Sequence, residues 1–169
     1  ETTLMPSGVT PKLIAWSAND NFIAISSTAG KLYTMDINEG VTSINEVPNS
    51  YDAIDPEILA LHWNIRTNTI MFSRSSVGIS EIKPDGSNLK VLVPKSIIPS
   101  AQKKIVAFHP WMQSTNLSVN TILFVDETGT AYEYELIYDR LGNYGNTIYS
   151  DGSTVRDVSE NGLAFMTRV

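Results

Sequence analysis

The chain has 169 residues, of which 42% are hydrophobic, so it is long and apolar enough to bury a core. Its formal net charge of −6, with 12 Lys and Arg against 18 Asp and Glu, argues against tight nonspecific binding to nucleic acid or anionic lipid. It has no Cys, which excludes disulfides, thiolate zinc sites and a cysteine nucleophile, and no apolar run approaches the about 20 residues of a membrane-spanning helix.

One short pattern, an Asn followed by an apolar β-prone segment, occurs four times along the chain. It starts at Asn21, Asn68, Asn120 and Asn161, at intervals of 47, 52 and 41 residues. Periods of this length are typical of solenoids, propellers and related repeat arrays. No window has the sustained i, i+3, i+4, i+7 apolar spacing of a helix, so the repeats are expected to consist of strands.

The first repeat predicts four strands, at residues 13–17, 22–27, 31–37 and 41–47. Because side chains alternate along a strand, Tyr33, Met35 and Ile37 should share one face of the third strand. Gly30 precedes this strand, at a position where a tight hairpin needs a glycine. The first repeat therefore has the pattern of an antiparallel meander.

The second repeat follows the first at a shift of 47 residues, which places Trp63 on Trp16. It predicts strands at 58–63, 69–75, 78–83 and 88–93. The sequence Lys-Pro-Asp-Gly-Ser at 83–87 is a turn signal before the last of these strands.

The third repeat predicts strands at 105–109, 121–126, 130–138 and about 146–150. Compared with the second repeat it needs five extra residues before Asn120. We assign them to a lengthened hairpin loop at 111–119, because loops absorb insertions that would turn the side chains of a strand to the other face.

Four short antiparallel strands in each period of about 40–50 residues describe a propeller blade. The sequence therefore predicts an all-β fold: a β-propeller, or partial β-propeller, of about three and a half four-stranded blades. The expected blades cover about 11–48, 56–94 and 103–150, with a partial blade at 154–169. Since closed propellers have four to eight blades, we expect the chain to be a single propeller segment that belongs to a longer propeller or pairs with a further segment.

Two interpretations of the last residues remain open. In one, residues 155–159 form the inner strand and 162–168 the second strand of a fourth blade. In the other, residues 155–162 form a third strand that corresponds to 33–40 in the first repeat. The sequence does not separate them.

Residues 58–94 resemble a YWTD-type blade of the lipoprotein-receptor propellers. The similarity lies in the Leu-x-x-x-Trp inner strand that ends at Trp63, the Asp-Gly-Ser-Asn turn and the outer strand Lys-Val-Leu-Val; Met-Phe-Ser-Arg stands where Tyr-Trp-Thr-Asp is expected. The first and last repeats, with Trp-Ser or Val-Ser before an Asn-containing turn, resemble the periplasmic propellers of the Tol system. These resemblances imply a propeller and favour a secreted or periplasmic location.

His62 and His109 occupy equivalent positions one repeat apart. They suggest a ring of metal ligands, but no acidic residue shares their spacing, so we expect both to have a structural role at the end of an inner strand. The chain also lacks a Gly-x-Ser-x-Gly elbow and a phosphate-binding Gly-rich loop. We therefore predict no catalytic residue, no metal and no cofactor.

Tyrosines are concentrated in the third repeat. We expect Tyr132 and Tyr134 to pack between blades, as Tyr33 and Met35 would in the first. Aromatic residues offer large amphipathic area to a partner, and the elaborated part of the third repeat contains several of them. The candidate partner-binding aromatics are Trp111, Tyr138, Tyr144 and Tyr149.

The link between the second and third repeats, residues 94–104, contains Lys95, Lys103 and Lys104. Links that enter an inner strand lie at the mouth of a propeller's central channel, where ligands commonly bind. Lys103 and Lys104 are therefore candidate partner- or anion-binding residues; the alternative is a solvated connecting loop whose charges serve solubility.

The leading functional hypothesis is a non-catalytic propeller module that binds a protein or peptide, because elaborated loops on rigid scaffolds often carry function. Nucleic acid is not an expected partner, and no membrane span is expected. The alternative is the propeller portion of a hydrolase or metal-dependent enzyme whose catalytic residues lie outside this segment. A third possibility is a purely structural segment of a large assembly.

Overall fold

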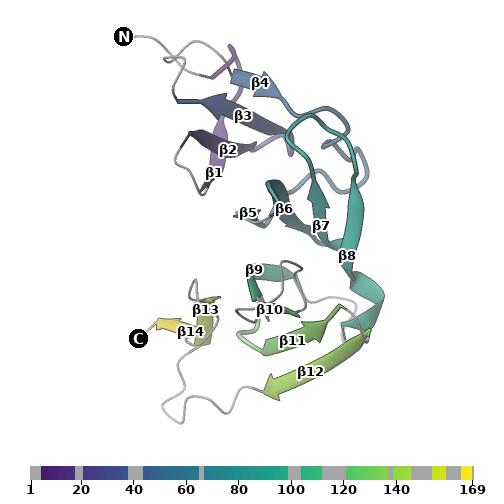
Figure 1. Cartoon of the computed structure of the whole chain (residues 1–169). Helices are drawn as coiled ribbons and strands as arrows, with labels where there is room; N and C mark the ends of the chain where they lie inside the picture. Colours follow the sequence, from purple (N-terminus) through teal and green to yellow (C-terminus); the bar gives the residue numbers. More distant parts are fainter. Residues whose placement is uncertain are drawn as a thin grey trace.

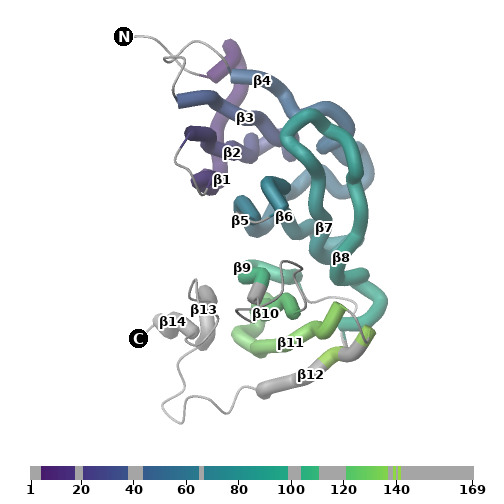
Figure 2. The backbone as a smooth tube through the Cα atoms, viewed as in Figure 1, coloured from purple at the N-terminus to yellow at the C-terminus, as the bar shows by residue number. Residues whose placement is uncertain are grey.

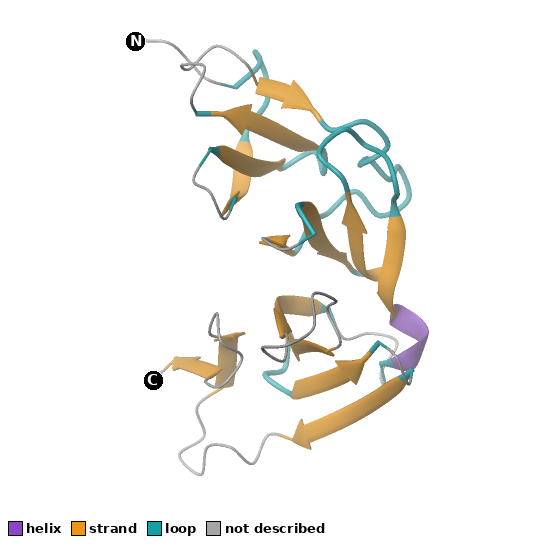
Figure 3. Cartoon of the chain, viewed as in Figure 1, coloured by secondary structure: helices purple, strands orange, loops and turns teal. Residues whose placement is uncertain are grey.

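The computed structural model describes residues 5–17, 21–37, 44–64, 67–98, 104–111, 121–136, 139–145, 154–158 and 165–168. Strands dominate these residues, and the one helical turn among them is the 3-10 helix η1 (Lys95–Ile97) (Figure 3). The described part of the chain contains no helix that is long and apolar enough to span a membrane.

The strands form three four-stranded sheets and one two-stranded sheet, all antiparallel. Blade A consists of β1 (Pro11–Trp16), β2 (Phe22–Ser27), β3 (Leu32–Asp36) and β4 (Ile44–Glu46). Blade B consists of β5 (Ala60–Asn64), β6 (Thr69–Arg74), β7 (Gly78–Ile82) and β8 (Lys90–Pro94). Blade C consists of β9 (Ile105–Trp111), β10 (Thr121–Asp126), β11 (Ala131–Glu135) and β12 (Arg140–Gly145), and half-blade D of β13 (Thr154–Val158) and β14 (Phe165–Arg168).

Each four-stranded sheet is a meander in which the strands are neighbours in chain order. The first strands of successive blades lie together, with β1 beside β5, β5 beside β9 and β9 beside β13. The blades are thus arranged along an arc, with these first strands on its inner side (Figures 1 and 2). The chain has an all-β fold that forms a partial β-propeller of three and a half blades, as the sequence predicts.

Half-blade D corresponds to the first of the two interpretations of the last residues. β13 pairs with β14 and packs against both β9 and β10 of blade C. The segment around residues 154–158 is therefore an inner strand, and not the third strand of a blade.

Most predicted strands lie within one to three residues of the observed ones, and the segments 22–27 and 121–126 coincide with β2 and β10. The predicted position of the fourth strand of blade C was wrong. The sequence predicts it at about 146–150, and it is observed at Arg140–Gly145. The chain turns back earlier than expected because Asp139 adopts a left-handed conformation (φ 50°) and accepts a hydrogen bond from the hydroxyl of Tyr134. Asp139 thereby stabilises a short β11–β12 turn.

The hydrophobic cores lie between the blades. Blades A and B share a cluster of buried side chains: Ala15, Ala24, Leu32, Val47, Ile58, Trp63, Ile70, Phe72 and Ile82. Blades B and C share a second cluster with the η1 region: Met71, Ile79, Val93, Ile98, Ile105, Phe108, Ile122, Phe124, Tyr132 and Tyr134. Burial of both faces of blade B explains why β6 and β7 are buried along their whole length.

The predicted role of Tyr132 and Tyr134 is confirmed, because both lie in the cluster between blades B and C. Tyr132 also stacks on Phe124 with ring centroids 5.0 Å apart. The parallel expectation for Tyr33 and Met35 was wrong within the described residues. They contact Ile23, Ile25 and Ile44 of their own blade and Met5 and Val9 of the preceding segment, since no described blade faces them.

The link between blades A and B is held by buried Arg74. Its guanidinium donates hydrogen bonds to the carbonyl oxygens of Asp55 (2.6 Å), Gly30 (3.0 Å) and Ser50 (2.6 Å). Gly30 adopts φ +79°, and a Cβ built there would lie 1.6 Å from the carbonyl oxygen of Pro56. The glycine predicted to form a hairpin is therefore also needed for the close approach of this link.

Candidate functional site

The two histidines meet at the inner strands of blades B and C. The ring centroids of His62 and His109 are 4.9 Å apart in an edge-to-face arrangement, and His62 also lies edge-to-face with Phe108 at 6.3 Å. Burial, and to a smaller extent the neighbouring His109, lowers the pKa of His62 to about 4. His62 is therefore neutral near pH 7, and its contacts are those of an interblade packing residue.

A metal site needs more ligands than the two histidines His62 and His109. Among the described residues there is no group of three or more His, Asp or Glu side chains that could hold a metal ion. Two imidazoles without a carboxylate leave half of the positions of a tetrahedral ion, and most of those of an octahedral ion, unfilled.

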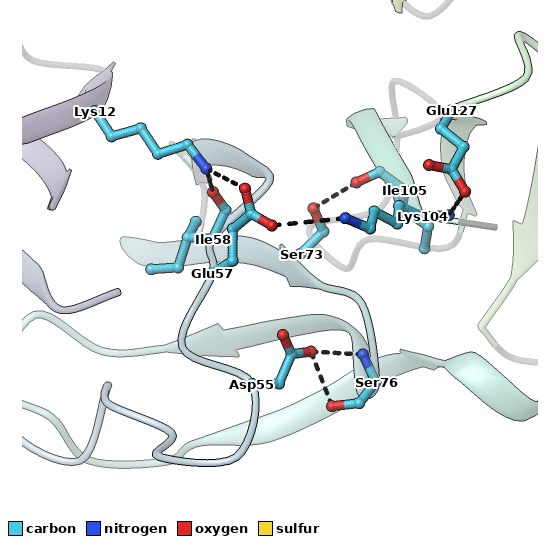
Figure 4. A network of polar contacts seen from close by, with 9 residues as sticks. All are labelled: Lys12, Asp55, Glu57, Ile58, Ser73, Ser76, Lys104, Ile105 and Glu127. Carbon is cyan, nitrogen blue, oxygen red and sulfur yellow. Dashed lines mark hydrogen bonds and ion pairs between the residues drawn. The ribbon is translucent and has the colours of Figure 1, made fainter. Parts of the chain in front are cut away.

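A chain of polar contacts connects blades A, B and C at the end where the links enter the inner strands (Figure 4). Lys12 Nζ lies 3.0 Å from Glu57 Oε1 and donates to the carbonyl oxygen of Ile58 at 2.8 Å. The other oxygen of Glu57 lies 3.7 Å from Lys104 Nζ, and the Lys104 amide donates to Glu127 Oε1 at 3.3 Å. The hydrogen bond from Lys12 is the main cause of the lowered pKa of Glu57.

These contacts bear on the predicted lysine site. Lys104 lies beside the carboxylate of Glu57, which also faces Lys12, so its charge is balanced by a neighbour in blade B. Lys95 is partly buried, which lowers its pKa and opposes its positive charge. Lys103 lies outside the described residues. The contact of Lys104 with Glu57 therefore connects blade C to the link before blade B, and partner binding by Lys103 and Lys104 stays a prediction.

The aromatic candidates are described in part. Trp111 is the last residue of β9, opposite Thr121, and Tyr144 belongs to β12; the side chains of both are outside the described part, as are Tyr138 and Tyr149 entirely. β9 begins next to Lys104 and ends at Trp111, which places them about 20 Å apart along the strand. The structure does not bring Lys104 and Trp111 together, so they cannot form one small site.

Blade B has a shallow surface groove beside its outer strands, over residues that sequence reasoning did not single out. Its polar groups bind one another: Thr69 Oγ1 donates to Glu81 Oε2 at 3.1 Å, and Lys90 Nζ lies 2.7 Å from Glu81 Oε1. The groove is lined by Thr67, Thr69, Glu81, Lys83, Asn88, Leu89 and Lys90. Since both oxygens of Glu81 are engaged, the groove offers a ligand no free carboxylate at this residue.

Among the described side chains of the inner strands, the largest apolar exposure is on blade A, and sequence reasoning did not single it out either. Trp16 is 57% exposed and Ile14 61% exposed, on the face of β1 opposite to Ala15, which packs against blade B. Trp16 aligns with Trp63, whose side chain is 2% exposed. The alignment of the two tryptophans was the signal that could have identified this face.

No family model matches the chain, and no curated protein is similar to it in sequence. Solved structures are similar in fold. A structural genomics protein of unknown function from Bacteroides thetaiotaomicron matches with a TM-score of 0.63 and 8% identity, over 93% of this chain and 44% of that one. A chain of the COPII outer coat vertex on membranes matches with a TM-score of 0.62 and 18% identity, over 86% of this chain and 39% of that one.

A chain of the COPII coat assembled on membranes also has a TM-score of 0.62 and 18% identity, over 86% of this chain and 21% of its own length. This chain therefore spans less than half the length of each of these three structures. At these identities the similarity establishes the fold and not the activity. The chain is thus similar in fold to a part of each of these three chains.

Proposed function

We propose that the chain is a non-catalytic propeller module that binds a protein partner. The observation that supports this most is the use of its buried charges. The buried charged residues in the described ranges are Arg74, Glu81 and Asp126. Each of them is engaged by the protein's own groups, so none is presented to a substrate.

The contacts of Asp126 illustrate this structural use. One oxygen of its carboxylate accepts hydrogen bonds from the amides of Thr128 (2.9 Å) and Thr130 (3.0 Å) and from the Thr128 hydroxyl (2.6 Å). The other accepts from the hydroxyl of Tyr132 at 3.1 Å. A carboxylate engaged by this many donors of its own chain holds the β10–β11 turn, which is a poor arrangement for a general base.

The similarity to chains of the COPII coat supports a role in protein assembly, because propellers offer rigid rims for partners. The resemblance of residues 58–94 to a YWTD-type blade supports the same class of function. We place the partner at the end of blade C where β9 stops at Trp111 and β10 resumes at Thr121. The insertion in the third repeat lies in the sequence between these two strands.

The test is a chain in which residues 112–120 are replaced by Asn-Gly. Trp111 and Thr121 are paired across β9 and β10, so a two-residue hairpin turn can join them without a change of register. We expect this variant to keep the wild-type thermal midpoint and to lose the partner that the intact chain retains in a cross-linked pull-down identified by mass spectrometry.

A matched control changes an exposed site away from that end of blade C. Ile54→Ser removes a side chain that is 93% exposed in the link between blades A and B. It should leave the captured partner unchanged. Equal capture by the shortened chain and by wild type, with both folded, would contradict the proposed binding surface; a chain that captures no protein at all would contradict the proposed function.

A further inference from the structure

Blade A has an apolar face that no described blade covers. Strand pairing aligns the side chains of this face in two rows that cross the sheet. One row consists of Ile14, Ile25 and Tyr33. The other consists of Trp16, Ile23, Met35 and Ile44. These residues form what we call the open face: Ile14, Trp16, Ile23, Ile25, Tyr33, Met35 and Ile44. Half or more of the surface of Trp16 and Ile14 is exposed. Ile23, Ile25 and Tyr33 are buried, so the exposed apolar patch of this face lies on β1, at Ile14 and Trp16. An exposed patch of large apolar side chains marks an interaction site.

The equivalent face of blade B shows which side chains pack against such a face when a blade covers it. Trp63, Ile70 and Phe72, which align with Trp16, Ile23 and Ile25, are buried in the cluster shared with blade A. Trp63 stacks on Phe22 of blade A with ring centroids 6.1 Å apart, and its indole donates to Asn68 Oδ1 at 3.0 Å. Apart from Phe22, the preceding blade contributes small and aliphatic residues to this cluster.

Blade C repeats the arrangement. Ile122 and Phe124, which align with Ile70 and Phe72, are buried in the cluster shared with blade B. They pack with Met71, Ile79 and Val93 of blade B. In the two pairs whose side chains are described, A–B and B–C, the preceding blade covers the same face of the blade that follows.

The segment before β1 covers the open face only in part. Met5 and Val9 pack against the cluster of Ile23, Ile25 and Tyr33. Trp16 and Ile14 remain exposed despite this contact. A segment that closed the array would be expected to bury the tryptophan, which is the largest side chain of the face.

We propose that the open face of blade A is the docking surface for a further four-stranded propeller blade, supplied from outside residues 1–169. The docking blade presents small and aliphatic side chains like those that blade A presents to blade B. The arc of three and a half blades supports this occupant, because closed propellers have four to eight. The proposal is independent of the partner proposed at blade C.

The experiment replaces Trp16 with the photo-cross-linker p-benzoylphenylalanine in the protein as it is made in its own cell. A second variant carries the same cross-linker at Ile14, in the neighbouring row of the open face. The control carries it at Val91, which is 49% exposed on the outer strand β8 of blade B. Cross-linked peptides are identified by mass spectrometry.

We expect both open-face positions to capture one segment from outside residues 1–169, with the period-two alternation of a blade strand, in several-fold higher yield than Val91. Cross-links from position 16 that join two copies of residues 1–169 into a covalent dimer would overturn the proposal, because a second copy would then cover the face; cross-links within one chain, to the neighbouring Ile23 strand, are expected in either case. A yield no higher than that of Val91, or capture of a segment that is not part of a blade, would overturn it as well.

Discussion

Arg74 is predicted to be the main polar link between blades A and B. Arg74→Met keeps a long side chain that can still contact Phe72, over whose ring the guanidinium carbon lies at 5.4 Å. It removes the donors to Gly30, Ser50 and Asp55. A hydrogen bond to a charged group contributes about 1.5–3 kcal/mol, so the bonds would together amount to several times that figure.

Burial opposes this gain, because it lowers the pKa of Arg74 and therefore disfavours the charged form. The methionine variant recovers that desolvation cost but leaves buried carbonyl groups without a donor. We expect the free energy of unfolding to fall by about 3 kcal/mol, which is within the range for removal of one partner from a buried polar network.

Urea unfolding followed by circular dichroism measures the change. For a slope of about 1–3 kcal/mol per molar urea, the midpoint should fall by roughly 1–3 M. Arg74→Lys keeps the charge but cannot reach three carbonyl groups in the same geometry. Its urea midpoint should therefore lie between those of wild type and Arg74→Met. A midpoint for Arg74→Met within about 0.3 M of wild type would refute the reasoning, since it would mean that water replaces the guanidinium without cost.

The remaining predictions use matched positions. Trp63→Ala should lower the free energy of unfolding by about 3–5 kcal/mol. Trp16→Ala, at the aligned exposed position, should lower it by less than about 1 kcal/mol in the isolated chain. Equal losses in urea unfolding would contradict the difference in exposure between the two tryptophans. Gly30→Ala should lower the thermal midpoint well beyond Gly8→Ala, because both glycines have positive φ but only a Cβ at Gly30 would overlap the link carbonyl, whereas none lies within 4 Å of Gly8. The pKa of His62 is about 4 in the folded chain, against 6.5 for a free imidazole. Between pH 4 and 6.5 the unfolded chain therefore binds a proton that the folded chain does not bind. Stability present above pH 6.5 should thus be lost as the pH falls towards 4, by at most about 3 kcal/mol, and His62→Gln should flatten this dependence in unfolding measured across that range. The isolated 169-residue chain should self-associate in sedimentation velocity through its open face and strand edges, and Trp16→Glu should reduce the association; a monodisperse wild-type monomer would contradict it.

Local patterns in the sequence predicted the elements well. The segments 22–27 and 121–126 were identified at their observed bounds because each is a short apolar, β-prone run after a turn-forming Asn, a signal that depends on only a few neighbouring residues. The fourth strand of blade C was misplaced because its residues are polar and glycine-rich, and their strand conformation depends on pairing with β11. Edge strands of this kind have little local signal.

What the sequence by itself determined is the repeat: strands of set length, tight turns between them, and hence a stack of antiparallel blades. What only the tertiary structure decided is which of two equivalent residues is buried and which is exposed. Trp16 and Trp63 occupy the same place in their repeats, yet one is exposed and the other buried, because burial depends on whether a neighbouring blade lies above them. In the same way Lys104 meets Glu57, 47 positions earlier in the chain, only because the arc brings successive links to one end of the blades. Such contacts arise from the packing of whole sheets, and no local pattern encodes them.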